Sequence, residues 1–413
     1  MSSLPLSRAA ALSAWGAFLP QVRQYAARRN HVEPGHENVS RLSPALRHRL
    51  LTEDEVIAGT LDRFSFGAAE KWLQEVCWRR YWKGWLELRP QVWTSWRSRV
   101  RELRGTSPPG ILERAEAVAS GESGVACMDL IARELIGTGY LHNHARMWWA
   151  SFWVHAEGLP WELGADFFFR HLLDADPASN TLSWRWVSGL QTPGKTYLVR
   201  LSNLEKYAGE TLLRDPGGSH RIADGAVKPM LQQDWADTTK RPLANLPPEP
   251  APCAGRTGLW LHADDLAPET GLGPRFCPDA VAAFSSERIY RERYRLAEHR
   301  IAALHTVLAD GVARAGAHFG CPAMLWDTDD PVAAICSWAE AEQLTRIVAF
   351  APQVGPVGDL VPRLSSRLAG MGTTLHLIRR SSDTHAFSLA GSGFFPFWEK
   401  MSRHLQTNPV PAV

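Results

Sequence analysis

Apolar residues recur at helical spacing through the first 240 residues of the chain. Three helices are expected from this pattern, each ending near a glycine or proline: residues 69–88, 127–138 and 146–157. A fourth is expected to begin after Thr52, because Glu55 follows three positions later as in a capping box. No convincing strand alternation occurs in this half, so an all-helical domain is predicted for residues 1–244.

The pattern changes near residue 245. Residues 245–257 are rich in proline and are expected to form a stiff, extended connector. Five short apolar runs follow, at residues 258–262, 281–284, 323–326, 346–350 and 374–378. Helical stretches separate them, the longest at residues 286–315. Strands that alternate with helices predict βαβ units, so residues 258–405 are expected to form a Rossmann-like parallel α/β domain.

The bulk composition is that of an ordinary globular protein. The 413 residues are 45% hydrophobic and 21% charged, and the net charge is +2. No apolar run reaches the roughly 18 residues that a membrane helix needs, and no signal-peptide pattern occurs, so a cytoplasmic protein is expected. The absence of a CxxC pair favours reduced thiols over an iron–sulfur or zinc site. The six cysteines are Cys77, Cys127, Cys253, Cys277, Cys321 and Cys336.

The distribution of arginine and the abundance of tryptophan are more informative than the overall composition and net charge. Arginines crowd the first hundred residues, and several on one face would attract phosphate, although solvated helix faces are the simpler explanation. Tryptophan occurs 18 times. So dense a set indicates a large core, a surface on which bases stack, or an electron path between rings, and a tryptophan-rich core covers most of them.

The first segment with candidate chemistry precedes Pro44. Here Ser40, Leu42 and Ser43 stand at the start of an expected helix. Hydroxyl and backbone N–H groups at such a position form an anion site that suits a pyrophosphate. A serine-rich helix cap is the commoner explanation of this pattern, so the segment alone decides nothing.

The second segment lies on the helix expected at residues 69–88. Glu75 and Arg79 are four residues apart and can pair on one face, and Trp78 lies on the same side. A carboxylate beside a large aromatic plane could recognise a base by hydrogen bonding and stacking. A surface ion pair is the plainer alternative.

The third segment is the longest and has two parts, residues 139–147 and 174–186. The second part places two aspartates, an asparagine and two tryptophans within thirteen residues. The carboxylates could bind a metal ion, but no third ligand appears at metal-like spacing, so no metal site is predicted. A histidine such as His142 or His144 is more often structural than catalytic.

Together these segments resemble the photolyase/cryptochrome family over residues 25–201. Four motifs occur in family order: Ser-Arg-Leu-Ser, Trp-Leu-x-Glu-x-x-Trp-Arg, Thr-Gly-Tyr-Leu-His-Asn-x-x-Arg-Met, and Asp-Ala-Asp-x-Ala-x-Asn-x-x-x-Trp-x-Trp. The resemblance implies a photolyase-type helical domain that binds FAD folded into a U. Because all four motifs occur in this order, the family resemblance is favoured over explaining each segment separately as a helix cap, a surface ion pair or structural histidines.

The resemblance also implies a role for each matching residue around FAD. Arg146 would pair with Asp174 beside the isoalloxazine ring, Asp176 would lie near the polar edge of the ring, and Asn180 would face N5. Asparagine at this last position is typical of repair enzymes in the family. The residues implied to hold the phosphates are Tyr25, Ser40, Leu42 and Ser43, and those implied to line the cofactor cavity are Trp72 and Arg79.

The implied substrate is a cyclobutane pyrimidine dimer in UV-damaged DNA. Glu75 matches the carboxylate that binds the 5′ base, and Trp78 and Trp186 match the aromatic walls of the dimer pocket. Asn143 and Met147 match the pattern of cyclobutane-dimer enzymes, because enzymes for (6-4) photoproducts have histidine at both positions. His144 departs from the arginine that is common there, which weakens an expected substrate or phosphate contact and suggests a preference for single strands.

Electron transfer along tryptophans is also implied by the resemblance. Trp184 and Trp161 match the first two members of the family's chain. The surface member is expected near residues 100–106, where no tryptophan occurs. Either photoreduction is impaired or the electron-transfer chain ends at another tryptophan, for which the candidates are Trp148, Trp149 and Trp96.

The α/β domain follows the helical domain here, whereas family members usually begin with an α/β antenna domain. Residues 259–266 resemble the first antenna strand and its turn, and the phenylalanine-rich residues 394–398 resemble the close of that domain. A permuted antenna domain is therefore expected, with an unrelated Rossmann-like domain as the alternative. No GxGxxG loop follows the first strand, which argues against a second dinucleotide site, and the antenna chromophore is left undefined.

The resemblance implies a deoxyribodipyrimidine photo-lyase, acting as a monomer by electron transfer from excited reduced FAD. The first alternative is a cryptochrome-like blue-light photoreceptor without repair activity. The second is a flavoprotein that binds DNA or a partner and has lost catalysis. The residues at Glu75, Trp78, Asn143, Met147 and Asn180 favour repair.

Overall fold

The structure is a computed structural model that describes residues 4–192, 195–252 and 254–407. Contacts between Cα atoms divide the chain into two compact units, which are described separately. Residues 23–41 and 89–239 form the helical unit, whereas residues 4–22, 42–88 and those from Lys240 onward form the mixed unit. This division does not follow the sequence-based boundary at residue 244, because two N-terminal segments group with the α/β part.

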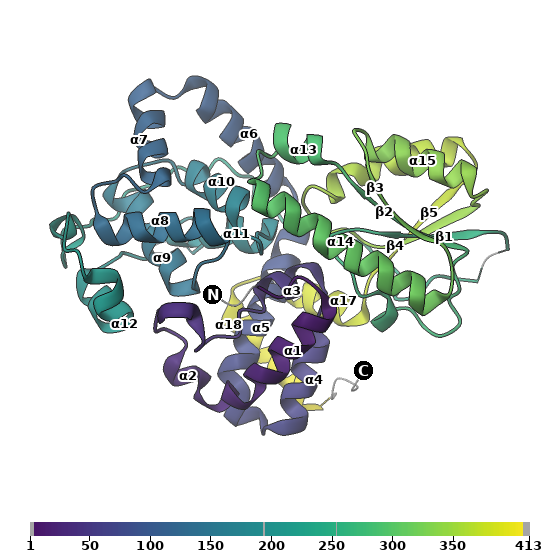
Figure 1. Ribbon diagram of the computed structural model, residues 1–413, viewed down its shortest axis with the longest axis horizontal. Coiled ribbons are helices and arrows are strands. Elements are labelled where there is room, and N and C mark those ends of the chain that lie inside the picture. Colours follow the sequence, from purple (N-terminus) through teal and green to yellow (C-terminus); the bar gives the residue numbers. More distant parts are fainter. Residues whose placement is uncertain (1–3, 193–194, 253, 408–413) are drawn as a thin grey trace. The chain divides into compact units, whose positions relative to one another are not determined.

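The described residues of the helical unit contain helices and no strand, as the apolar pattern predicts. Its α-helices are α2 (Tyr25–Arg28), α6 (Gln91–Thr106), α7 (Pro109–Ser120), α8 (Ala126–Thr138), α9 (Asn143–Ser151), α10 (Trp161–His171), α11 (Pro177–Val187) and α12 (Leu201–Leu213). Figure 1 shows most of them in blue to teal. A short π-helix, η3 (Phe152–Ala156), continues α9, so the helix expected at residues 146–157 is present with a wider last turn.

Tryptophans fill much of the core of the helical unit. Six of them are at most 2% exposed: Trp93, Trp96, Trp148, Trp149, Trp153 and Trp184. Because large aromatic side chains bury more area than any others, this set supplies a major part of the hydrophobic stabilisation of the unit. The prediction that many of the 18 tryptophans belong to a tryptophan-rich core is confirmed.

The mixed unit begins with helices α1 (Arg8–Phe18), α3 (Ser43–His48), α4 (Glu53–Arg63) and α5 (Phe66–Glu87). The predicted capping box starts α4: Thr52 Oγ1 accepts from Glu55 N at 3.2 Å, and Glu55 Oε2 accepts from Thr52 N at 2.8 Å. The helix expected at residues 69–88 is α5, which begins three residues earlier.

All five predicted strands are present in the mixed unit and form one parallel sheet. They are β1 (Thr257–Leu261), β2 (Ala280–Ser285), β3 (Ala323–Asp327), β4 (Arg346–Phe350) and β5 (Thr374–Ile378). The strand order is β3-β2-β1-β4-β5, and every pair is parallel. The order reverses at β1, as in open α/β sheets of the Rossmann type.

Helices cover both faces of this sheet. They are α14 (Glu298–Phe319), α15 (Pro331–Ala341) and α16 (Val361–Gly370). The short α13 (Glu287–Glu292) precedes α14, and α17 (Ser381–Leu389) and α18 (Phe394–Thr407) follow β5. In Figure 1, α14 and α15 lie on opposite sides of the strands. The expected single helix at residues 286–315 is wrong: residues 293–297 break it, and Arg295 has a left-handed φ of 53° that an α-helix cannot accommodate.

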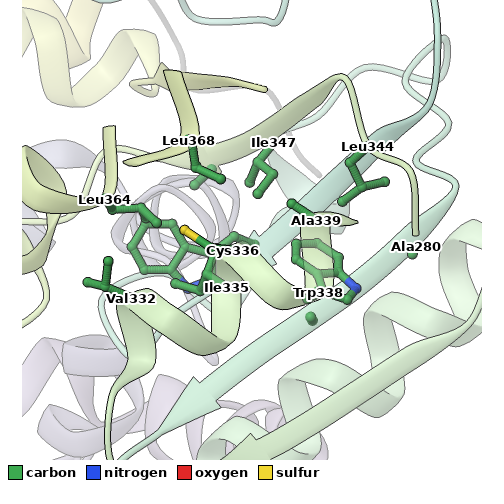
Figure 2. Close-up of a cluster of buried hydrophobic side chains, with 13 residues drawn as sticks. Ala280, Val332, Ile335, Cys336, Trp338, Ala339, Leu344, Ile347, Leu364 and Leu368 are labelled. Atoms are coloured by element: carbon green, nitrogen blue, oxygen red, sulfur yellow. The ribbon is translucent and has the colours of Figure 1, made fainter. Parts of the chain in front are cut away.

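The core beneath α15 and α16 shows why this part of the chain folds into layers. Ile335, Trp338 and Ala339 of α15 and Leu364 and Leu368 of α16 meet alternate residues of the strands (Figure 2). All are buried, so one stripe of each helix packs on one face of the sheet. Gly258 of β1 is required there, because a Cβ atom would lie 2.5 Å from the Trp338 ring.

A buried network of charges joins α4 and α5 to the carboxyl edge of the sheet within the mixed unit. Arg49 is its centre and binds Asp265 at 2.8 Å, Asp383 at 2.6 Å and Glu53 at 3.3 Å. Arg380 binds the same Asp265 at 2.8 Å. Further pairs in the same network are Lys83–Glu53, Arg80–Asp54, Arg80–Asp383 and Arg47–Asp264. These partners lie up to 334 residues apart in the sequence.

Three further observations bear on the class of protein. None of the helices in the described ranges is long and apolar enough to cross a membrane. Within those ranges no three His, Cys, Asp or Glu side chains are grouped so that they could hold a metal ion. The five cysteines that the structure describes are free thiols, and Cys253 lies outside the described residues.

Candidate functional site

The predicted site residues fall in both units, and each group is described within its own unit. The helical unit contains Tyr25, Ser40, Asn143, His144, Arg146, Met147, Trp161, Asp174, Asp176, Asn180, Trp184 and Trp186. The mixed unit contains Leu42, Ser43, Trp72, Glu75, Trp78 and Arg79.

An ion pair joins α9 to the loop before α11 in the helical unit. Arg146 Nη2 donates to Asp174 Oδ2 at 3.0 Å, and Arg146 Nε donates to the carbonyl of Leu141 at 2.9 Å. The Asp174 side chain is only 3% exposed, whereas that of Arg146 is 22% exposed. The arginine thus neutralises a buried carboxylate while keeping part of its guanidinium accessible to a polar ligand. The sequence-based pairing of these residues is present, and its place beside a flavin stays a prediction.

Asp176 and Asn180 lie one turn apart on α11. Asp176 is the N-cap of this helix, and its Oδ1 accepts from Ala178 N at 2.8 Å and Ser179 N at 2.9 Å. Asn180 Nδ2 donates to the carbonyl of Ala165 at 2.8 Å. That bond fixes the plane of the amide and leaves Oδ1 as its group for accepting a hydrogen bond from a ligand.

Trp184 is packed against other aromatic rings of the helical unit. Its ring lies 6.2 Å from Trp149, 6.5 Å from Trp153 and 5.1 Å from Phe168, all edge-on. Its Nε1 is buried without a hydrogen-bond partner among the described atoms. Trp149, one of the candidates for extending the tryptophan path, therefore packs directly against Trp184.

Replacing Gly164 with alanine is expected to displace Trp184 and to destabilise the protein by roughly 1–3 kcal/mol, because a Cβ atom would lie 2.3 Å from that ring. Gly137 is the matched control, because it also lies in a helix but a Cβ atom there would meet open space. Alanine at that position should leave the stability unchanged or raise it by up to about 1 kcal/mol. Urea unfolding of both variants measures the difference. Equal stabilities would show that the packing around Trp184 adapts.

Trp161 begins α10 and lines a small pocket of the helical unit with Trp96, Glu162, Arg185 and Trp235. Burial raises the pKa of Glu162 to about 7. Trp235 is 54% exposed and was not among the candidates for the surface end of the tryptophan path. No local pattern marks it, because residues 223–239 have no regular secondary structure.

The predicted substrate residues of the helical unit lie on α9 and α11. Asn143 is exposed, Met147 is half-buried, and Asn143 Nδ2 lies 3.8 Å from Met147 Sδ one turn away. Trp186 is half-buried and stacks on Tyr197 with ring centroids 5.8 Å apart. These three side chains retain accessible surface for a ligand.

His144 differs from its neighbours because it is enclosed. Its Nδ1 lies 2.8 Å from the carbonyl of Asn30, its Nε2 lies 3.3 Å from the Tyr197 hydroxyl, and its ring stacks on Trp148 at 4.4 Å. Burial lowers the pKa of the imidazole. With both nitrogens occupied and the charged form disfavoured by burial, this arrangement favours a structural role for His144 over a contact with DNA.

In the mixed unit, α5 carries the predicted substrate carboxylate. Glu75 lies 3.4 Å from Lys71 Nζ in an i,i+4 pair, and 23% of its side chain is exposed. The half-buried Trp78 ring stacks on Phe394 with centroids 3.6 Å apart and planes 7° apart. The sequence reasoning missed Phe394, because it lies 316 positions further along the chain on another helix.

Trp72, expected to line a cofactor cavity, lies in an aromatic cluster of the mixed unit. It is 4% exposed, stacks on Trp15 at 5.6 Å, and donates from Nε1 to Thr60 Oγ1 at 3.1 Å. Leu42 is fully buried, and Ser43 is the first residue of α3. These surroundings favour a core role for Trp72, and the cofactor role stays a prediction.

Comparison with known proteins gives a matching family model for part of the chain. Residues 72–212 match the FAD binding domain of DNA photolyase. The deoxyribodipyrimidine photo-lyase of Escherichia coli is 31% identical over 180 residues, 40% of this chain and 35% of that protein. That of Thermus thermophilus is 34% identical over 191 residues, 46% of this chain and 44% of that protein. The chain thus spans less than half the length of these relatives.

Solved structures also align with part of the chain. A class III photolyase from Agrobacterium tumefaciens is 24% identical, with a TM-score of 0.43, over 50% of this chain and 44% of that one. A cryptochrome from Synechocystis is 20% identical, with a TM-score of 0.40, over 53% and 48%. The matched domain implies FAD as the cofactor. Over residues 72–212, the chain is thus similar to the FAD-binding domain of the photolyase/cryptochrome family.

Proposed function

We propose that the protein is a light-driven DNA repair flavoenzyme that splits cyclobutane pyrimidine dimers. The observation that carries this proposal is the arrangement on α9 and α11, where the Arg146–Asp174 pair, the oriented amide of Asn180 and the buried Trp184 lie in the segment that matches the photolyase domain. The names of the relatives support dimer splitting as the reaction.

The polar groups of the helical unit fit a flavin. An isoalloxazine ring presents hydrogen-bond donors and acceptors along one edge, and Arg146 and Asp174 offer a partner for each. Asn180 Oδ1 would accept a hydrogen bond from the N–H group at N5, because Asn180 Nδ2 already donates to the carbonyl of Ala165. FAD, when bound, supplies the light absorption and the electron.

The side chains of this protein would then bind and orient both reactants. Arg146 and Asn180 would fix the ring, and the aromatic packing of Trp184 would keep water away from it. Glu75 would accept hydrogen bonds from the dimer bases, and Trp78 would provide a stacking surface. The dimer must leave the base stack to reach such groups, which costs a few kcal/mol and less in a single strand.

Illumination of the purified, reduced, FAD-loaded protein with a dimer-containing oligonucleotide is expected to remove dimers, and faster from single than from double strands. The measurement follows dimer loss against a dark control and against an undamaged oligonucleotide. Absence of repair on either substrate, with FAD bound and fully reduced, would contradict the proposal. It would favour a cryptochrome-like photoreceptor instead.

A further inference from the structure

The C-terminal helix α18 is fastened along α5 within the mixed unit. The Tyr81 hydroxyl donates to the carbonyl of Ser392 at 2.7 Å, just before α18 begins. One helical turn into α18, Trp398 Nε1 donates to Glu70 Oε1 at 3.2 Å. Because residues later in α18 meet residues earlier in α5, the two helices run antiparallel. Phe394 lies between these two attachments.

The rings of Phe394 and Trp78 are closely stacked in the mixed unit. The centroids are 3.6 Å apart and the planes differ by only 7°. Phe394 is 4% exposed, whereas Trp78 is half-buried, so the phenylalanine covers one face of the indole and part of the indole stays accessible. Tyr81 meets both rings edge-on, at 5.5 Å and 5.6 Å.

This stack restricts the Trp78 ring to one plane. A nearly eclipsed pair is less favourable than an offset pair, so the packing of α18 on α5, rather than ring attraction alone, holds the two faces together. A half-buried tryptophan without such support samples other rotamers and loses entropy when a base stacks on it. A ring already fixed in plane avoids much of that loss.

We propose that Phe394 is a positioning residue, which holds Trp78 in the orientation needed to stack on a base of the damaged strand. The inference rests on the proposed function, since it takes Trp78 as part of the substrate wall. It assigns to the C-terminal helix a part in recognising the lesion. Phe395, the next residue, is 75% exposed and meets the Phe394 ring only edge-on at 5.9 Å, so it is used as the comparison.

The test measures dark binding to dimer-containing and undamaged oligonucleotides of the same length, with the full-length, FAD-loaded protein. Phe394→Leu is expected to weaken binding of the dimer strand about 10-fold, as for loss of one base stack, and to leave binding of the undamaged strand unchanged. Phe394→Tyr retains a flat ring and should restore affinity. Phe395→Leu is the matched control and should behave like the wild type.

A double-mutant cycle distinguishes positioning from general support. In a Trp78→Ala background, Phe394→Leu should have no further effect on dimer binding, because the ring it positions is gone. Additional weakening there, or equal weakening for both oligonucleotides, would overturn the proposal. If leucine prevents folding, Phe394→Met is used instead, because its unbranched side chain adapts to the site better than leucine does.

The same titrations separate this inference from the proposed function. Wild-type protein that binds both oligonucleotides equally would contradict the proposed function itself, and the inference with it. Wild-type protein that prefers the dimer strand, with Phe394→Leu unchanged in that preference, would overturn only the role of Phe394.

Discussion

Replacing Glu75 with alanine is expected to lower light-driven dimer repair by about 100-fold, while FAD remains bound. A loss of rate of this size is typical when one hydrogen-bonding group that stabilises charge developing during a reaction is removed. Glu75 lies on the long helix α5, and only 23% of its side chain is exposed, so it is held in place rather than mobile. Initial rates of dimer loss under constant illumination measure the effect, with FAD content read from the visible absorbance.

Two variants serve as controls for this prediction. Glu75→Gln keeps the shape of the side chain and removes the charge, so an intermediate rate is expected. Asp62 is an exposed carboxylate on α4, and Asp62→Ala should repair at the wild-type rate. Repair by Glu75→Ala within twofold of the wild type would contradict the assigned role, whereas loss of FAD from that variant would point to a structural role.

The strands could be predicted from the sequence because each is a short apolar run between polar turns. The five predicted runs match β1 to β5 within two residues at either end. The capping box at Thr52 was equally readable, since both hydrogen bonds join residues three apart. The helix break near Arg295 could not be predicted, because the spacing of apolar residues does not indicate that an arginine adopts a left-handed backbone conformation.

Local pattern predicted the candidate site only where neighbours in sequence are neighbours in space, as for Asp176 and Asn180 on one face of α11. The pairing of Arg146 with Asp174, 28 residues further along the chain, was implied by the family resemblance instead. The cover on Trp78, by contrast, comes from Phe394 on a distant helix. Whether a tryptophan faces a ligand or a neighbouring ring depends on such contacts, which local pattern does not contain.

The grouping of segments was also set by distant contacts. The sequence suggests a boundary at the proline-rich stretch, where composition changes. In the structure, α4 and α5 group with the sheet, and the buried charges of Arg49 and Arg80 find their partners on both sides of that stretch. The sheet order fits a Rossmann-like domain, and its origin as a permuted antenna domain stays a hypothesis.

Replacing Arg49 with methionine is expected to destabilise the protein by about 3–5 kcal/mol, the cost of leaving buried carboxylates without their cation. The guanidinium is 4% exposed and contacts Glu53, Asp265 and Asp383. Methionine keeps most of the side-chain volume, so the loss reports charge rather than a cavity. Arg403→Met is the control, since the pair of Arg403 with Glu399 is exposed and such pairs contribute about 0–1 kcal/mol.

The penalty for Arg49→Met should depend on pH, because the carboxylates around it are perturbed. The pKa of Glu53 is lowered by the charges of Lys83 and Arg49, and that of Asp265 by Arg380 and Arg49, in each case against burial. Carboxylates with depressed pKa values stabilise the folded state above their unfolded pKa of about 4, and that contribution is lost as the pH falls through the folded pKa.

The difference in unfolding free energy between Arg49→Met and the wild type should therefore be largest near pH 7 and shrink below about pH 4, since a protonated carboxyl group no longer needs the guanidinium. Urea unfolding at about pH 7, 5 and 3.5 measures this difference. A penalty independent of pH would show that Arg49 stabilises the fold by packing. A penalty as small as that of Arg403→Met would mean that Lys83 and Arg380 suffice for the carboxylates, and that Arg49 is not the centre of the network.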